Sequence, residues 1–162
     1  MKTIIVPVDF SPASLNAANY AMDLANTIKG SVTFMYVYQF PVSISEVPVS
    51  GEYINTMIED AEKSMVDLKK NMLHKWGEKI KIYTELKEGN VIMQVKELCS
   101  ALNPYAVVMG AHGAGAMERI LFGSNTLQAI RNISWPLIIV PAGASFKNIR
   151  KIGLACDLQK VP

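Results

Sequence analysis

The sequence has few of the residues that build disulfides or metal sites. Of its 162 residues, two are cysteines and two are histidines. Cys99 and Cys156 lie far apart and fit no metal-binding or redox spacing, so a disulfide framework and a cysteine-based metal site are not expected. Cysteines that are not paired in disulfides are typical of a reducing compartment, and we therefore expect a cytoplasmic protein.

Long apolar runs and an excess of one charge are also missing. The apolar run Ile4–Val8 is too short for a signal peptide and is interrupted by Pro7, and no run approaches the length of a membrane span. The 16 basic and 14 acidic residues give a net charge of +2 and are mixed along the chain. We therefore expect neither a membrane protein nor a nucleic-acid-binding protein.

Several motifs of nucleotide-binding and hydrolytic enzymes are absent. The chain has no G-x-x-x-x-G-K-[ST], G-x-S-x-G or H-E-x-x-H sequence, which excludes a P-loop, a nucleophile elbow and a zinc-protease helix. Gly113 and Gly115 begin a G-x-G, but Glu118 stands where a dinucleotide fold has its third glycine. Because no nucleophile–base pair can be assigned, we predict no catalytic residue.

What the sequence does contain is an alternation of strand and helix patterns. Short runs rich in Ile and Val predict strands at Thr3–Val8, Ser31–Tyr38, Lys79–Leu86, Tyr105–Met109 and Leu137–Val140. Apolar residues at helical spacing predict helices from Pro12 to a stop at Gly30, then over Glu52–Trp76, Val91–Leu102 and Leu127–Ile133. This alternation predicts an α/β fold in three layers, an open parallel five-stranded sheet with helices on both faces.

The strand order remains open at this point. If it is 3-2-1-4-5, the first and fourth strands are neighbours and the winding of the chain reverses between them. Ligands bind outside the carboxyl ends of the strands at such a switch point. Asp9 follows the first strand and Gly110 follows the fourth, so this order would bring both into one crevice.

Residues 110–126 connect the fourth strand to the last helix and read G-A-H-G-A-G-A-M-E-R-I-L-F-G-S-N-T. Glycine allows the backbone to come close to a ligand. A helix start offers unpaired N–H groups and the positive end of the helix dipole. The segment therefore predicts an anion site, most naturally for phosphate, with a glycine-rich loop that only turns the chain as the alternative.

The spacing Gly110-x2-Gly113-x9-Gly123-Ser124 resembles the ATP-binding signature of the universal stress protein family. The opening strand I-I-V-P-V-D and the later run W-P-L-I-I-V-P agree with it, and the resemblance covers roughly residues 1–142. It implies the strand order 3-2-1-4-5 and a Rossmann-like fold similar to that of the adenine nucleotide alpha hydrolases.

The resemblance also implies an ATP site, with Mg²⁺ accompanying the nucleotide. Pro7, Val8 and Asp9 would flank the adenine and ribose, and Val37 would contact the adenine through its backbone. The glycines would approach the sugar and phosphates, and the helix start would hold the phosphates. The full set of implied cofactor-binding residues is Pro7, Val8, Asp9, Val37, Met109, Gly110, Gly113, Gly123, Ser124, Asn125 and Thr126. No protein residue is assigned as a metal ligand.

Three functions fit this sequence. The first is an ATP-binding regulatory or stress-response domain that acts by binding. The second is a slow ATP hydrolase, for which Asp9 is the one evident candidate base. The third is a dimerisation or scaffold domain whose site stays empty. Fold alone cannot choose among them.

The end of the chain carries a second pattern. Arg150–Asp157 repeats the design of Lys2–Asp9, with a basic start, an apolar run and a final aspartate. We expect one domain over residues 1–144 and, over residues 145–162, a linker and the first strand of a truncated second repeat. The native partner would then be the second domain of a tandem chain, and we expect a homodimer of this fragment through the apolar strand Pro136–Pro141.

Overall fold

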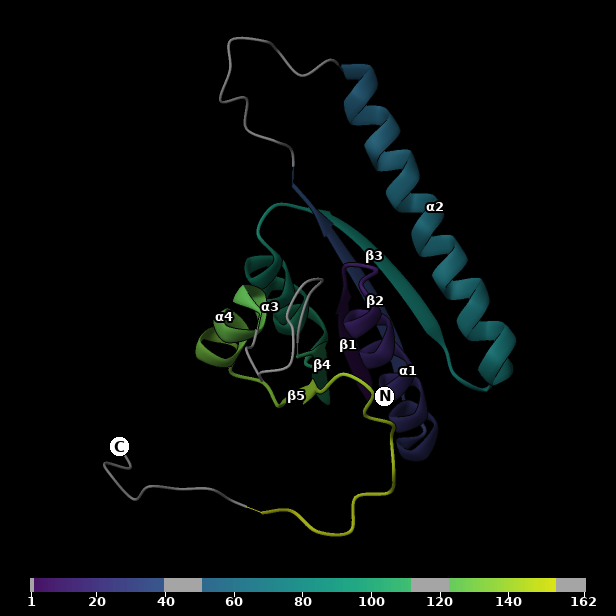
Figure 1. Cartoon of the computed structure of the whole chain (residues 1–162), viewed down its shortest axis with the longest axis vertical. Helices are drawn as coiled ribbons and strands as arrows, with labels where there is room; N and C mark the ends of the chain where they lie inside the picture. Colours follow the sequence, from purple (N-terminus) through teal and green to yellow (C-terminus); the bar gives the residue numbers. More distant parts are fainter. Residues whose placement is uncertain (1, 40–50, 112–122, 154–162) are drawn as a thin grey trace.

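The computed structural model describes residues 2–39, 51–111 and 123–153, and its five strands form one parallel sheet in the order β3-β2-β1-β4-β5 (Figure 1). Both the α/β class and the strand order 3-2-1-4-5 are therefore confirmed. Along the chain the elements are β1 (Thr3–Val8), α1 (Pro12–Ile28), β2 (Ser31–Tyr38), α2 (Gly51–Trp76), the 3₁₀ turn η1 (Gly77–Lys79), β3 (Ile82–Glu88), α3 (Val91–Leu102), β4 (Ala106–Gly110), α4 (Ser124–Asn132) and β5 (Leu137–Val140).

The two faces of the sheet are covered by different helices. In the central strand β1, Ile4 and Val6 join a core with α1 and α2, whereas Ile5 joins a second core with α3 and α4. All three side chains are fully buried, which explains why this strand reads as an uninterrupted apolar run. Figure 1 shows α1 and α2 on one side of the sheet and α3 and α4 on the other.

The methionine-containing stripe of α2 is core packing. Ala61, Met65, Leu68 and Met72 recur at spacings of three and four residues and are the buried residues of this helix. The rest of α2 is largely exposed, and among the described helices none is both long enough and apolar enough to cross a membrane.

The third strand begins later than predicted. We expected it to start at Lys79, but Gly77, with a φ of 68°, opens a 3₁₀ turn that lasts through Lys79. The ladder begins where Ile82 pairs with Val32 of β2. Apolar residues do alternate over 80–84, but Ile80 lies between the turn and the strand.

The end of α1 also differs in detail from the prediction. The residue in the left-handed conformation is Lys29, with a φ of 52°, and not the expected Gly30. Glycine is needed at Gly30 for a different reason, because a Cβ there would lie 2.7 Å from the carbonyl oxygen of Lys2. The chain thus turns sharply from α1 into β2.

After β5 the chain runs back across α1. The Asn16 side-chain amide donates to the carbonyl oxygens of Pro141 and Ala144, both at 3.1 Å, and the rings of Tyr20 and Phe146 pack edge to face at 5.3 Å. Residues 147–153 contain no helix or strand. The rest of the segment expected to form the first strand of a second repeat, residues 154–162, lies outside the described residues.

Candidate functional site

A cavity of about 160 Å³ lies at the carboxyl ends of β1 and β4. These strands are neighbours, and α1 and α4, which follow them, cover opposite faces of the sheet. The winding therefore reverses here, as at the ligand-binding switch points of other open α/β sheets. Ten of the predicted site residues line this cavity, namely Pro7, Val8, Asp9, Val37, Met109, Gly110, Gly123, Ser124, Asn125 and Thr126. The eleventh, Gly113, lies outside the described residues.

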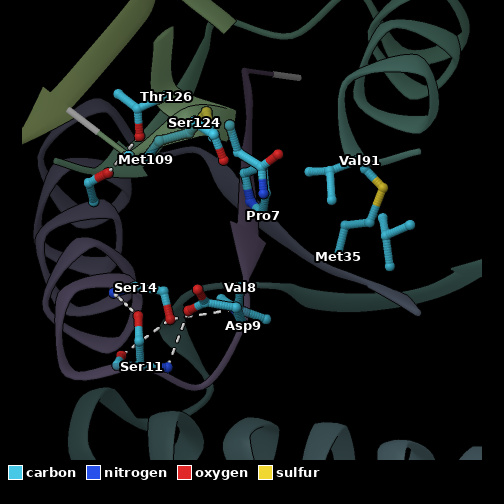
Figure 2. Close-up of a pocket in the computed structure, with 14 residues that line it drawn as sticks. Pro7, Val8, Asp9, Ser11, Ser14, Met35, Val91, Met109, Ser124 and Thr126 are labelled. Carbon is cyan, nitrogen blue, oxygen red and sulfur yellow. Dashed lines mark hydrogen bonds between the residues drawn. The ribbon is translucent and has the colours of Figure 1, made fainter. Parts of the chain in front are cut away.

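One polar wall is the turn from β1 into α1 (Figure 2). The backbone N–H of Ser11 donates to Oδ1 of Asp9 at 3.0 Å, and the backbone N–H of Asp9 donates to Oγ of Ser14 at 3.3 Å. Oγ of Ser11 caps α1 by accepting from the backbone N–H of Ser14 at 3.2 Å. Partial burial raises the pKa of Asp9, but hydrogen bonds from the two serines outweigh it and leave the pKa below its ordinary value of 3.8. Asp9 is therefore an ionised side chain held in one orientation.

The residue between Asp9 and Ser11 adds to this rigidity. Phe10 has a φ of 59°, in the left-handed region that costs a non-glycine residue roughly 1–2 kcal/mol. Its ring packs against Tyr36 of β2, with the ring centroids 5.1 Å apart. The packing of Phe10 offsets the backbone strain and fixes the position of its neighbour Asp9.

The second polar wall is formed by the end of β4 and the start of α4. At Gly110 a Cβ would lie 2.6 Å from the carbonyl oxygen of Ala13 in α1, so glycine is required by packing whether or not a ligand is bound. The hydroxyl of Thr126 donates to the carbonyl oxygen of Gly110 at 3.1 Å. Thr126 is buried, and its side chain joins α4 to β4.

The N-terminus of α4 differs from those of α1 and α3. Ser11 caps α1, and Asn90 caps α3 by accepting from the backbone N–H groups of Ile92 and Met93. The N-cap of α4 is Gly123, which has no side chain and provides no such hydrogen bond. Within the described residues, no N-cap side chain therefore occupies the first-turn N–H groups of α4, which lie at the cavity wall where the helix dipole favours negative charge.

The remaining wall of the cavity is apolar. It is formed by Met35 and Val37 of β2, Val91 at the start of α3, Pro7 of β1 and Met109 of β4. Figure 2 shows Met35 and Val91 together on one side of the pocket, with the Asp9 turn and the residues of α4 at separate places around it. A ligand with an apolar ring system and an anionic group matches these surfaces.

Sequence reasoning missed four residues that line the cavity, Ser11, Ser14, Met35 and Val91. Met35 had a usable signal, because it lies two residues before Val37 and alternate residues of a strand share a face. Ser11 stands directly before the predicted helix start at Pro12 and was not assigned to the site. Val91 belongs to a helix that reaches the cavity through the tertiary fold, and no local pattern marks it.

Comparisons of sequence identify the family of this chain. The model of the universal stress protein family matches residues 1–141. A universal stress protein of Methanocaldococcus jannaschii is 30% identical over 141 residues, which make up 86% of this chain and 81% of that protein. A universal stress protein of Mycolicibacterium smegmatis is 27% identical over 85% of this chain and 47% of its own length.

Solved structures are similar in fold at lower sequence identity. A universal stress protein of Lactobacillus plantarum superposes with a TM-score of 0.73 at 21% identity, over 86% of this chain and 97% of that one. A universal stress protein solved with cAMP (TM-score 0.66, 18% identity) covers 88% of this chain and 98% of its own. One from Arabidopsis thaliana with AMP bound (TM-score 0.55, 13% identity) covers 89% and 94%. With the family match over residues 1–141, the chain belongs to the universal stress protein family.

Proposed function

We propose that this cavity binds ATP and that the protein is a nucleotide-dependent regulatory module. The observation that carries the proposal is the start of α4, where Gly123 provides no side-chain cap for the first-turn N–H groups at the wall of a cavity that also has an apolar side. Uncapped N–H groups and the helix dipole favour phosphate. Relatives solved with cAMP and with AMP support an adenine nucleotide as the ligand class.

In this proposal the adenine lies against the apolar wall. Val37 contacts it through its backbone, and Pro7, Val8 and Asp9 flank the adenine and ribose. Gly110 provides a surface without a side chain beside the sugar, and Gly123–Thr126 hold the phosphates. Oγ of Ser124 and the amide of Asn125 add donors that belong to the cavity lining.

Magnesium would enter with the nucleotide. Across the described residues, no three His, Cys, Asp or Glu side chains gather into a metal cluster. The donor set therefore suits a cation held mainly by phosphate oxygens and water, which is how Mg²⁺ commonly binds in nucleotide sites. Asp9 is the carboxylate that lines the cavity.

The cavity favours binding over hydrolysis. A general base works best when its pKa lies near the working pH. The pKa of Asp9 is lowered by its serine hydrogen bonds, which makes this carboxylate a weak base. We therefore propose that ATP changes the shape or the partners of the protein and is turned over slowly if at all.

The test begins with the purified protein, without added nucleotide. Denaturation followed by mass analysis identifies any co-purified ligand, and calorimetric titration with Mg-ATP measures affinity. Ser124→Asp places a negative charge at the start of α4, and we expect it to weaken ATP binding at least tenfold, or about 1.4 kcal/mol. Ser100→Asp adds the same charge to the exposed side of α3 and should leave the affinity unchanged.

Two results would overturn the proposal. If the wild-type protein bound no Mg-ATP at millimolar concentration, a scaffold function with an empty site would be favoured over ATP binding. ATP turnover at rates typical of enzymes, about 1–1000 per second, would replace a binding module with a hydrolase.

A second proposal concerns assembly. β5 is an edge strand with four apolar residues, of which Leu137, Ile138 and Ile139 are partly exposed. An apolar edge strand with unpaired backbone groups is a surface for pairing with another chain. We propose that two copies associate through Pro136–Pro141, which would give this protein a dimerisation role alongside nucleotide binding.

A further inference from the structure

A second cavity, of about 330 Å³, lies at the opposite ends of the strands from the candidate nucleotide site. It is bordered by the end of α1, the turn into β2 and the segment that leads from η1 into β3. All strands of the sheet are parallel, so this cavity lies at the end of the sheet where the strands begin. The two cavities therefore have no residue in common.

The rim of this second cavity is basic. Lys29, Lys79 and Lys81 line it together with the amide of Asn26, above a floor formed by Ala25 and Ile80. The three lysines are exposed, while Ala25 and Ile80 are buried. Each rim side chain can donate hydrogen bonds, and none of them is a carboxylate.

The lysines reach the cavity from two separate segments of the backbone. Lys29 is in the left-handed turn that ends α1. Lys81 is fixed beside β2, because its carbonyl oxygen accepts from the backbone N–H of Val32 at 3.0 Å. Lys79 ends η1, two residues earlier in the chain. The convergence of the three charges is therefore a property of the fold.

The surrounding protein offsets only part of this charge. The salt bridges within the described residues are Lys70–Asp67 and Lys87–Glu85, and neither includes a rim lysine. Glu78 adjoins Lys79 in η1 but does not line the cavity. The C-terminus of α1 supplies roughly half a negative charge, which is less than the charge of even one lysine.

We propose that this lysine-lined cavity binds a compact, multiply charged phosphate anion. Three ammonium groups and an amide around one cavity match the charge and the acceptor oxygens of such an anion. The site is exposed to solvent, so binding is weak and falls as salt is added. The proposal does not depend on ATP binding at the other end of the sheet.

The test is a titration of the full chain with pyrophosphate at low ionic strength, followed by ¹H–¹⁵N NMR. The protein carries Ser124→Asp, which disfavours phosphate at the start of α4. We expect saturable shifts of the amides of residues 26–30 and 79–81. The variant K29Q/K79Q/K81Q should weaken binding at least tenfold, because each exposed charge pair contributes roughly 1 kcal/mol in water, or about fivefold in affinity.

The matched control is K63Q/K96Q/K147Q, which removes the same total charge from exposed lysines of α2, α3 and the C-terminal segment. It should keep wild-type affinity. Equal weakening in both triple variants would mean that pyrophosphate responds only to net charge, and the proposal would fail. It would also fail if no amide at 26–30 or 79–81 shifted.

Discussion

Gly110 has no room for a side chain, since a Cβ would come within 2.6 Å of the carbonyl oxygen of Ala13. We expect Gly110→Ala to force β4 and α1 apart and to lower the free energy of unfolding by about 1–3 kcal/mol, the usual cost of overpacking. Urea denaturation measures this change. Gly51→Ala is the control, because no atom of the described residues lies within 4 Å of a Cβ at Gly51 and alanine favours the helix.

An unchanged stability of Gly110→Ala would mean that α1 shifts freely, and that the glycine at this position serves the ligand alone. Gly110 thus illustrates how a residue chosen from a binding signature can also be required for folding. Its two roles are separable, because the first is measured without nucleotide.

Asp9 makes a pH-dependent contribution to stability. Its pKa is below 3.8 in the folded protein, so the ionised form stabilises the fold above the unfolded-state pKa, and that contribution is lost as the pH falls through the folded pKa. Asp9→Asn lacks this titration. We therefore expect the wild type to exceed Asp9→Asn in stability at pH 7, with the difference shrinking between about pH 5 and about pH 2. Urea midpoints measured across this range test it, and a difference that stays constant with pH would argue against the serine-bound carboxylate.

Among the elements, the three helices whose N-caps lie in the described part of the chain begin in two ways. α1 and α3 start with side-chain caps, from Ser11 and Asn90, and are complete without a ligand. α4 starts at Gly123, without a side-chain cap. This contrast distinguishes α4, whose start faces the anion in our proposal, from α1 and α3, whose first turns are capped by their own side chains.

The side-chain cap on α3 is expected to contribute to the stability of the protein. Asn90→Ala removes the acceptor for the N–H groups of Ile92 and Met93 and should cost about 1 kcal/mol of stability. Asn90→Ser, which keeps an acceptor, should recover most of it. Thermal denaturation of the two variants makes the comparison, and equal loss in both would show that the side-chain amide packs instead of capping.

At the scale of the whole molecule, the edge at β5 allows a direct test of assembly. The carbonyl oxygen of Pro136 accepts from Val107 in β4, and that of Val140 accepts from Ala111, directly after β4. By alternation, the backbone groups of Leu137 and Ile139 point away from the sheet. Ile139→Pro removes one outward N–H without removing a bond to β4. We expect sedimentation to report a dimer for the wild type and a monomer for this variant at micromolar concentration.

Ile139→Ala serves as the control for the lost side chain, which is partly buried against the core of α3 and α4. It keeps the N–H group and should remain dimeric if strand pairing holds the two copies together. A monomeric wild type would rule out the proposed homodimer.

Much of the fold follows from local patterns in the sequence. The apolar run of β1, the apolar stripe of α2 at spacings of three and four residues, and Pro12 at the start of α1 each indicate an element that the structure confirms. Ten of the predicted site residues meet in one cavity because parallel strands place their carboxyl ends at a common edge. At sharp turns, as at Gly77 and Lys29, the helix and strand boundaries of the structure differ from the predicted ones by a few residues.

Which residues meet in the two cavities depends on the tertiary structure and cannot be predicted from neighbouring residues in the sequence. Val91 comes to the cavity from α3, and the three lysines of the second cavity come from segments on either side of β2 and α2. The need for glycine at Gly110 is a contact with α1, almost a hundred residues earlier in the chain. Periodicity reports which face of one element is buried, whereas these features depend on which elements pack together, and that is determined by the whole core.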